Sequence, residues 1–519
     1  MKIVADLVVV NANIITMDPE KPRASSLAVK SYKVITVGTE DDVLDLIPHA
    51  KRVMDLGGKT VIPGFVDAHT HLTSTGIRSS QVNLSSVASS EEAIDALKTY
   101  SESNPEKEWI IGWGYDESKW ERRRYLNSKD LDKVSTKKPV VAIRIDGHLM
   151  SVNTLGLKRV GINLNQAGVE RNKKGEPTGI LKDIDGMHDK LRGTPEEIQE
   201  GIIAGTRIAA SFGITTAIDN IAEGYLRQIR EVEKRNEMYA RMVVNIPFEQ
   251  ISHLLKLGIT TGMGTPITRI GGLKIFTDGS IGAMTAAVSK SFKGSRSNLG
   301  MLLIEKKKYL SILRKAIAGG LQTVTHAIGD RAIEMVLSAF EELSEEEKSI
   351  VRVQRHRIEH AEMITEDQIR RAVALGLILS MQPNFVAKWQ LEDGLYEQRF
   401  EKARVDSMNM FRVALDNGAR ICFGSDGMPL GPLYGIWAAT NHPNPSVRLT
   451  VEEALRCYTR ESAYASFLER TVGVIKEGAR ADFVVLSNDI LSIPPPRINE
   501  IEIEMTILGG ETVHSSLEG

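Results

Sequence analysis

Two histidines separated by one residue end a predicted strand in the segment VIPGFVDAHTHL. Residues two apart on a strand point to the same side, so His69 and His71 should present their imidazoles together. Imidazole nitrogens bind zinc and related metals, and this pair would supply half of a metal site. Asp67 has the same parity, which suggests that it orients a metal ligand without binding the metal itself.

Four further residues of metal-binding or acid–base type lie in or at the ends of later predicted strands. They are Lys274 in GGLKIFTDGS, His326 in TVTHAIGD, His360 in RIEHAE and Asp426 in CFGSDG. The chain has only 11 histidines, and four of them (His69, His71, His326 and His360) lie at such positions, which indicates a common site. In a barrel of parallel strands, catalytic groups from different strands meet at the C-terminal rim. We therefore predict that these residues converge with the first two histidines on a metal.

Eight strand-like segments alternate with helical patterns through the middle of the chain. Runs such as KKYLSILRKAIAGG and AIEMVLSAFEEL place apolar residues on one face of a helix. This alternation predicts an α/β fold, a (β/α)₈ TIM-like barrel. The strand segments are TVIPGFVDAHTH, GITTAIDN, ARMVVNI, IGGLKIFTDG, LQTVTHAIGD, QRHRIEHAE, LILSMQP and ARICFGSDG.

Both ends of the chain and one connection depart from the barrel pattern. Residues 1–63 and 469–519 are rich in β-branched residues with turn-forming breaks, which predicts one small composite β-sandwich. The barrel would then span residues 64–468. Its first connection is far longer than one crossover, which predicts an inserted subdomain at about residues 76–205. We expect this insertion to cover the barrel mouth and to set substrate specificity.

Five segments in order, PGFVDAHTH, GGLKIFTDGSIGAMTA, HAIGDRAI, RIEHAE and GSDGMP, resemble the amidohydrolase superfamily. Within it, the chain is similar over nearly its whole length to the YtcJ-like metal-dependent hydrolases, which include N-substituted formamide deformylases. The resemblance implies that His69 and His71 bind the more buried metal, and that His326 and His360 bind a second one. It also implies that Asp426 binds a metal and accepts a proton, which makes it the catalytic residue.

Lys274 would bridge both metals as a carboxylated lysine, again by resemblance. A lysine ammonium has no lone pair for a metal. Burial and nearby cations lower the pKa of a lysine, and its neutral amine can add carbon dioxide to give an anionic carbamate. The alternative is an unmodified lysine that pairs with Asp278 and leaves one metal. Zinc is the default divalent metal, although these ligands also suit manganese, nickel, iron or cobalt.

The predicted activity is hydrolysis of a C–N bond other than a peptide bond, in an amide-like small molecule such as an N-formyl or N-acyl amine. A metal lowers the pKa of bound water towards about 7, which makes hydroxide available, and Asp426 would act as the general base. One alternative is a deaminase on the same barrel, with one metal and an unmodified Lys274. Another is a non-catalytic scaffold, but this chain keeps all six ligand candidates.

Contact with substrate is predicted for His148, Trp113 and Asp278. His148 lies in a glycine turn of the insertion, RIDGHLM, which the resemblance places over the barrel mouth. The alternative for His148 is a surface or capping histidine. Trp113 and Tyr115, in GWGYD, would either wall the same pocket or pack in a core.

The segment RHRIEHAE also contains an H-x-x-E-H string formed by His356, Glu359 and His360. This string is a motif of certain zinc peptidases, which need it on a helix. The alternating pattern here predicts a strand instead, so we set the peptidase interpretation aside. His356 is then expected in a lower layer of the barrel.

Composition limits the classes of partner. A net charge of −2 with scattered signs argues against a general attraction to nucleic acid or anionic membranes. No stretch approaches the ~20 apolar residues of a membrane helix. The two cysteines lie outside any CxxC pair, which suits a reducing cytoplasm. We expect a cytoplasmic enzyme with a small-molecule substrate, and a homodimer only because such symmetry is common.

Overall fold

The computed structural model describes residues 4–145, 149–166, 168–182, 184, 191 and 193–517. The chain divides into two compact units. Unit 1 comprises residues 1–72 and 206–519, and unit 2 comprises residues 73–205. Among the described residues, no helix combines the length and apolar character that crossing a membrane requires.

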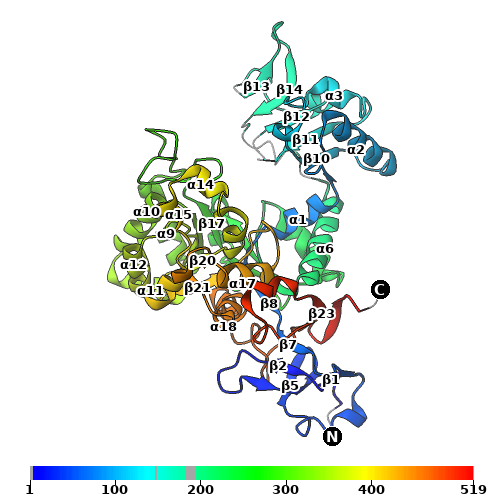
Figure 1. Ribbon diagram of the computed structural model, residues 1–519, viewed down its shortest axis with the longest axis vertical. Helices are drawn as coiled ribbons and strands as arrows, with labels where there is room; N and C mark the ends of the chain where they lie inside the picture. Colours follow the sequence, from blue (N-terminus) through cyan, green and yellow to red (C-terminus); the bar gives the residue numbers. More distant parts are fainter. Residues whose placement is uncertain are drawn as a thin grey trace. The chain divides into compact units, whose positions relative to one another are not determined.

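The centre of unit 1 is a sheet of eight parallel strands (Figure 1). Strands such as β15 and β18 are buried along their whole length, as is typical of a sheet covered on both faces. In spatial order the strands are β21 (Arg420–Phe423), β20 (Ile378–Met381), β19 (Arg357–His360), β18 (Gln322–Ala327), β17 (Thr268–Phe276), β16 (Arg241–Pro247), β15 (Ile214–Asn220) and β8 (Phe65–Thr70).

Each of the eight predicted segments contains one strand of this sheet, which confirms the parallel arrangement. The first segment differs in one respect, because it holds two strands. Its first part, β7 (Thr60–Pro63), pairs with β22 (Phe483–Leu486) in another sheet, and β8 begins after Gly64. A Cβ at Gly64 would lie 2.1 Å from Oγ1 of Thr215, so the chain can pass here only with glycine.

The two outer strands of the sheet, β8 and β21, meet at their C-terminal ends. The backbone nitrogen of Asp426 donates to the carbonyl oxygen of His69 at 2.7 Å. A Cβ at Gly424 would lie 2.3 Å from the backbone nitrogen of His69, so this approach requires glycine. The sheet is therefore nearly closed, as in a TIM-like barrel.

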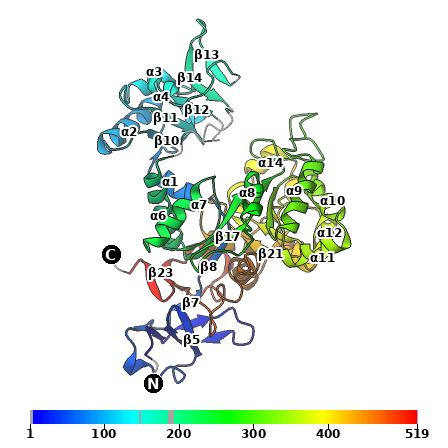
Figure 2. The same ribbon diagram turned by 180° about the vertical axis from the view of Figure 1, so that it is seen from behind.

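Helices follow most strands of the sheet, and α9 and α10 match the apolar stripes predicted from the sequence. A capping box between Thr365 and Gln368 begins α12, and Gly376 ends it in the left-handed region. Figure 2 shows α7 beside β17. The principal helices are α7 (Tyr225–Lys234), α8 (Ile251–Lys256), α9 (Lys306–Ala318), α10 (Asp330–Glu341), α11 (Glu345–Gln354), α12 (Glu366–Leu375), α16 (Phe411–Asp416), α17 (Pro432–Thr440), α18 (Val451–Arg456) and α19 (Ser462–Ala465).

The two ends of the chain form two further sheets of unit 1. Their apolar faces share one buried cluster, in which Leu7, Leu27 and Val61 accompany Phe483 and Ile507. Segments that are too short to bury their apolar faces alone thus cover each other. The four-stranded sheet runs β5 (Lys33–Gly38), β4 (Ser26–Lys30), β1 (Leu7–Val10), β6 (Val53–Asp55), and the six-stranded sheet runs β24 (Glu511–Ser515), β23 (Ile503–Leu508), β22, β7, β2 (Asn13–Ile15), β3 (Arg23–Ala24).

Unit 2 has its own six-stranded mixed sheet and its own core. Tyr115 stacks on Trp120 with ring centroids 5.5 Å apart, and its hydroxyl lies 3.1 Å from Oγ of Ser151. Of the two interpretations of Tyr115, core packing is therefore the observed one. The strands are β13 (Val169–Arg171), β14 (Pro177–Lys182), β12 (Leu149–Val152), β11 (Val140–Arg144), β10 (Ile110–Tyr115) and β9 (Val82–Asn83), and the longest helix within the unit is α2 (Ser90–Ser103).

Candidate metal centre

The C-terminal ends of β8 and β21 bring His69, His71 and Asp426 together. One ligand atom from each residue lies within 4.8 Å of the other two. Nε2 of His71 is 3.1 Å from Oδ1 of Asp426, and Nε2 of His69 is 3.6 Å from the same oxygen. This oxygen is buried, and no described residue gives it a well-directed hydrogen bond. Two ring nitrogens and a carboxylate oxygen in this arrangement form a donor set that suits a divalent cation.

Lys274, on β17, brings its amine to the same place. Its Nζ lies 3.2 Å from Nε2 of His69, and the residue is only 4% exposed. Burial lowers the pKa of Lys274 to about 8, so the neutral amine is accessible near neutral pH. The expected alternative, an ion pair with Asp278, is not formed among the described residues. The carboxylate of Asp278 instead accepts from three backbone nitrogens, those of Ala287, Ile328 and Gly329, at 2.8, 3.1 and 2.9 Å.

His326 and His360 extend the cluster from β18 and β19. The ring centroid of His360 lies 4.8 Å from that of His69 and 4.4 Å from that of His326. Nδ1 of His360 lies 2.7 Å from Oε1 of Gln382, and Nε2 of His326 lies 3.1 Å from the carbonyl oxygen of Gly279. A nitrogen beside such an acceptor carries the ring hydrogen. The nitrogen without a hydrogen, which can bind a metal, is then Nε2 in His360 and Nδ1 in His326.

Left-handed backbone conformations occur where β19 and β21 end. His360, Ala361 and Asp426 have φ angles of 71°, 50° and 55°. Non-glycine residues rarely adopt these angles, which cost about 1–3 kcal/mol each and cluster at functional sites. The bend at His360 allows two consecutive side chains, those of Glu359 and His360, to face the ring of His69. A regular strand would place them on opposite sides.

Burial governs the protonation of this cluster. It lowers the pKa values of His69, His326 and His360 well below 6.5, so the rings are neutral at neutral pH. Burial alone would raise the pKa of Asp426, but its neighbours, chiefly His71, lower it to about 2. Neutral imidazoles and an ionised carboxylate are the forms that bind metals.

A profile of the amidohydrolase family matches residues 52–514. The chain belongs to the amidohydrolase family. It is 29% identical to the putative amidohydrolase YtcJ of Bacillus subtilis (strain 168), over 96% of this chain and 98% of that protein. It is 25% identical to the N-substituted formamide deformylase of Arthrobacter pascens, over 97% of each chain. The crystal structure of an uncharacterized metal-dependent hydrolase from Pyrococcus horikoshii OT3 is similar, with a TM-score of 0.82, 26% identity, and coverage of 94% of this chain and 99% of that one. The resemblance seen in the sequence is thereby confirmed.

The predicted substrate residues of this amidohydrolase lie in three different settings. Asp278 is fully buried, and the three backbone donors hold its carboxylate, so substrate contact stays a prediction. Trp113 lies in β10 of unit 2, where its buried Nε1 has no hydrogen-bond partner among the described residues. His148 lies outside the described residues.

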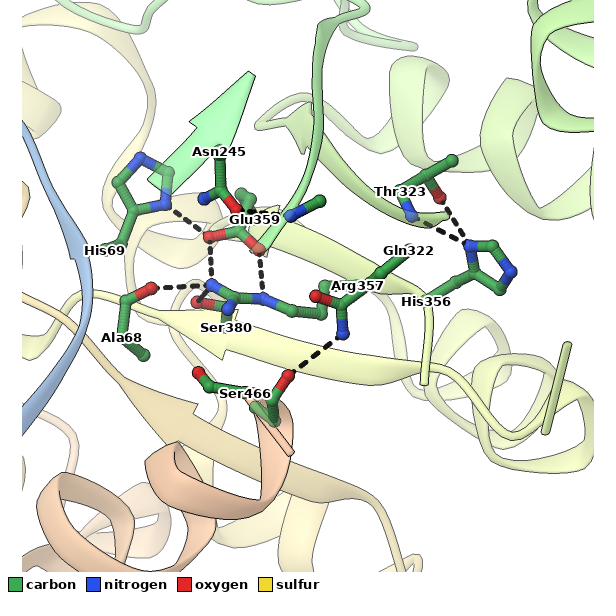
Figure 3. Close-up of polar contacts among 12 residues, drawn as sticks. Ala68, His69, Asn245, Gln322, Thr323, His356, Arg357, Glu359, Ser380 and Ser466 are labelled. Carbon is green, nitrogen blue, oxygen red and sulfur yellow. Dashed lines mark hydrogen bonds and ion pairs between the residues drawn. The ribbon is translucent and has the colours of Figure 1, made fainter. Parts of the chain in front are cut away.

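The acceptor behind the ring of His69 is Glu359 rather than Asp67. Oε2 of Glu359 makes a short contact with Nδ1 of His69 (Figure 3). The carboxylate of Asp67 accepts from the nitrogen and Oγ of Ser425, at 3.0 and 2.6 Å, and from the backbone nitrogen of His69 at 3.2 Å. Asp67 therefore contacts the backbone of His69 but not its ring, because strand parity gives the side of a residue but no distance to a ring.

Sequence reasoning missed Glu359, Arg357 and Gln382 as parts of the site. Glu359 and Arg357 stood in the segment that carries the H-x-x-E-H string. That segment forms the strand β19, as predicted, and not the helix a peptidase would need. The sequence analysis therefore identified the motif. Only the pairing of β19 with its neighbours showed which groups the side chains of β19 contact.

Proposed function

We propose that this amidohydrolase uses a divalent metal, by default zinc, to hydrolyse the C–N bond of an N-formyl or N-acyl amine. One observation carries the proposal: His69, His71 and Asp426 converge within 4.8 Å, with the amine of Lys274 3.2 Å from His69. A bound divalent cation supplies a polarised substrate carbonyl and a more acidic water. The similarity to an N-substituted formamide deformylase supports an amide-type substrate, and the similarity to a metal-dependent hydrolase supports the use of a metal.

The donor atoms support a proposal of two metal positions. His69 and His71 would hold one cation, and His326 and His360 would hold the other. The neutral amine of Lys274 would add carbon dioxide, forming a new N–C bond and releasing one proton. The resulting carbamate offers two oxygens, one for each position, and its negative charge offsets part of the charge of the cations.

Asp426 would carry the proton transfers. Its carboxylate is ionised at neutral pH, because its pKa is lowered to about 2. It would accept a proton from the attacking water and donate that proton to the leaving nitrogen when the C–N bond breaks. Transfers of this kind typically contribute ~10²–10⁴-fold to a rate.

Exposed apolar side chains at the end of β17 favour a substrate with an apolar substituent. Phe276 is 45% exposed, and its ring lies 4.8 Å from Nζ of Lys274 and 5.2 Å from the ring of His326. Leu303 is 54% exposed, and its backbone nitrogen donates to Thr277, the residue after Phe276. Apolar groups beside a few polar ones are typical of small-molecule sites.

Metal content and amine release together test the proposal. Wild-type protein reconstituted with zinc and bicarbonate should hold about two equivalents and release amine from an N-substituted formamide. Lys274→Gln should hold about one equivalent at most, because it cannot form a carbamate. One equivalent in the wild type, with release of ammonia instead, would indicate the deaminase. Absence of hydrolysis of formamides, acyl amines and cyclic amides by metal-replete protein would refute the proposal.

A further inference from the structure

A buried ion pair lies directly behind His69 and takes no part in the proton transfers above. Nε and Nη2 of Arg357 donate to Oε1 and Oε2 of Glu359 at 2.8 and 2.9 Å. Nη2 also donates to the carbonyl oxygen of Ala68 at 2.7 Å and to Oγ of Ser380 at 3.0 Å (Figure 3). Arg357 is 2% exposed and Glu359 is fully buried. Acceptors on β8, β19 and β20 therefore fix the guanidinium, and the guanidinium fixes the carboxylate.

The contact with Glu359 determines which ring nitrogen of His69 carries the hydrogen and which one does not. A carboxylate only accepts hydrogen bonds, so the Nδ1 atom that it contacts must carry the ring hydrogen. Nε2 then keeps its lone pair. This atom lies 3.2 Å from Nζ of Lys274 and 3.6 Å from Oδ1 of Asp426, so the lone pair faces the other members of the cluster.

The other two buried rings of the cluster are backed differently. Nδ1 of His360 meets the uncharged amide of Gln382, and Nε2 of His326 meets the carbonyl of Gly279, with Asp278 3.5 Å away. His69 differs from both, because the carboxylate in contact with its ring is itself held at both oxygens by an arginine. The negative charge of Glu359 is thus held in a fixed position beside the ring of His69.

We propose that Glu359, held by Arg357, is a positioning residue of the metal centre. It fixes the ring orientation and tautomer of His69, and its negative charge makes Nε2 a stronger metal ligand. This inference rests on the proposed function. A buried ion pair is weak evidence for stability, because desolvation of both charges offsets most of their attraction. A role in holding a ligand explains why two charges are kept at this position.

Zinc affinity, measured by chelator competition on the full chain, tests the inference. Glu359→Gln should bind zinc about 10–100-fold more weakly than the wild type. The matched control is Asp482→Asn, the same carboxylate-to-amide change at a buried residue whose two oxygens also accept from an arginine, Arg241. Asp482 contacts no histidine ring among the described residues, so its variant should keep wild-type affinity. Equal affinity in the wild type and Glu359→Gln, or an equal loss in both variants, would overturn the positioning role.

A double variant separates positioning from stability. Glu359→Gln alone leaves the guanidinium of Arg357 without its carboxylate, which destabilises the fold. Arg357→Met combined with Glu359→Gln removes both charges and should recover the thermal midpoint, while zinc affinity stays low. The visible spectrum of the cobalt-loaded double variant should also differ from that of the wild type, because His69 is no longer oriented. Recovery of affinity together with stability would mean that the pair is only structural. Failure of the wild type to bind zinc would instead refute the proposed function, and the inference with it.

Discussion

The two ends of the eight-stranded sheet differ in how several of their buried charged side chains and histidines are partnered. At the N-terminal end, Nε and Nη2 of Arg241 donate to the two oxygens of Asp482 at 2.7 and 2.9 Å. Just before β19, His356 is buried, with Nδ1 3.0 Å from the backbone nitrogen of Thr323 and Nε2 2.9 Å from Oε1 of Gln354. At this end, each of these polar groups is matched by a partner.

At the C-terminal end, potential metal ligands converge on one place. Oδ1 of Asp426 has no well-directed hydrogen bond among the described residues, Nε2 of His69 lies 3.2 Å from the amine of Lys274, and the ring centroids of His326 and His360 are 4.4 Å apart. A buried polar atom without a partner, such as Oδ1 of Asp426, is costly and calls for an explanation. The comparison agrees with the division found in other barrels of this type, in which the N-terminal end contributes to stability and the C-terminal end carries the functional groups. Changes at the two ends should therefore have different consequences.

The largest expected effect is that of Asp426→Asn at the C-terminal end. Turnover should fall by ~10²–10⁴-fold, because the amide cannot accept the proton of the attacking water. Metal content should fall far less, because the amide oxygen and the histidines remain. Steady-state rates and metal analysis on the same preparation check this. Equal losses of turnover and metal would remove the general-base role and leave Asp426 a ligand only.

At the N-terminal end, Asp482→Asn should lower the free energy of unfolding by about 3–5 kcal/mol, because it leaves the buried Arg241 unpaired. Zinc affinity should not change. Urea titration and chelator competition provide the two measurements. Glu231→Gln, at an exposed ion pair with Lys234, is the control and should leave the unfolding midpoint in place. If Asp482→Asn lowered the zinc affinity as well as the free energy of unfolding, the two ends of the sheet would not be functionally separate.

The pH dependence of stability should report on His356. Burial lowers its pKa from 6.5 to about 3, so below pH 6.5 the unfolded chain binds a proton that the folded chain does not. Stability is therefore lost as the pH falls, by about 1.4 kcal/mol per pH unit from this group. His356→Gln should show a slope smaller by that amount between pH 6.5 and about pH 5, measured by urea titration. Identical slopes would mean that His356 is protonated in the folded protein.

The smallest expected effect concerns substrate choice at the C-terminal end. Phe276→Ala should raise KM by about 10-fold for formamides with an apolar substituent, because an exposed ring beside the cluster is lost. Formamide itself, which has no substituent, is the matched control substrate and should be little affected. An equal change for both would place Phe276 in the support of the metal centre instead.

Much of the fold could be predicted from local patterns. The eight strands and the helices α9, α10 and α12 follow from apolar periodicity, which is a property of neighbouring residues. The candidate ligands could be found because His69 and His71 alternate along the chain at the end of one strand and the others lie in or at the ends of later strands. The partner of the His69 ring could not be found this way. Glu359 is 290 positions away, and its contact depends on strand order and on the bend at His360.

The sequence by itself determined which segments are strands and which chemical groups stand at their ends, because alternation and turn residues act over a few positions. Only the tertiary structure decided which atoms meet. Near closure between β8 and β21, the left-handed turns at His360 and Asp426, and the pairing of β19 with its neighbours set those distances. These features arise from packing across the whole sheet, and no local pattern encodes them.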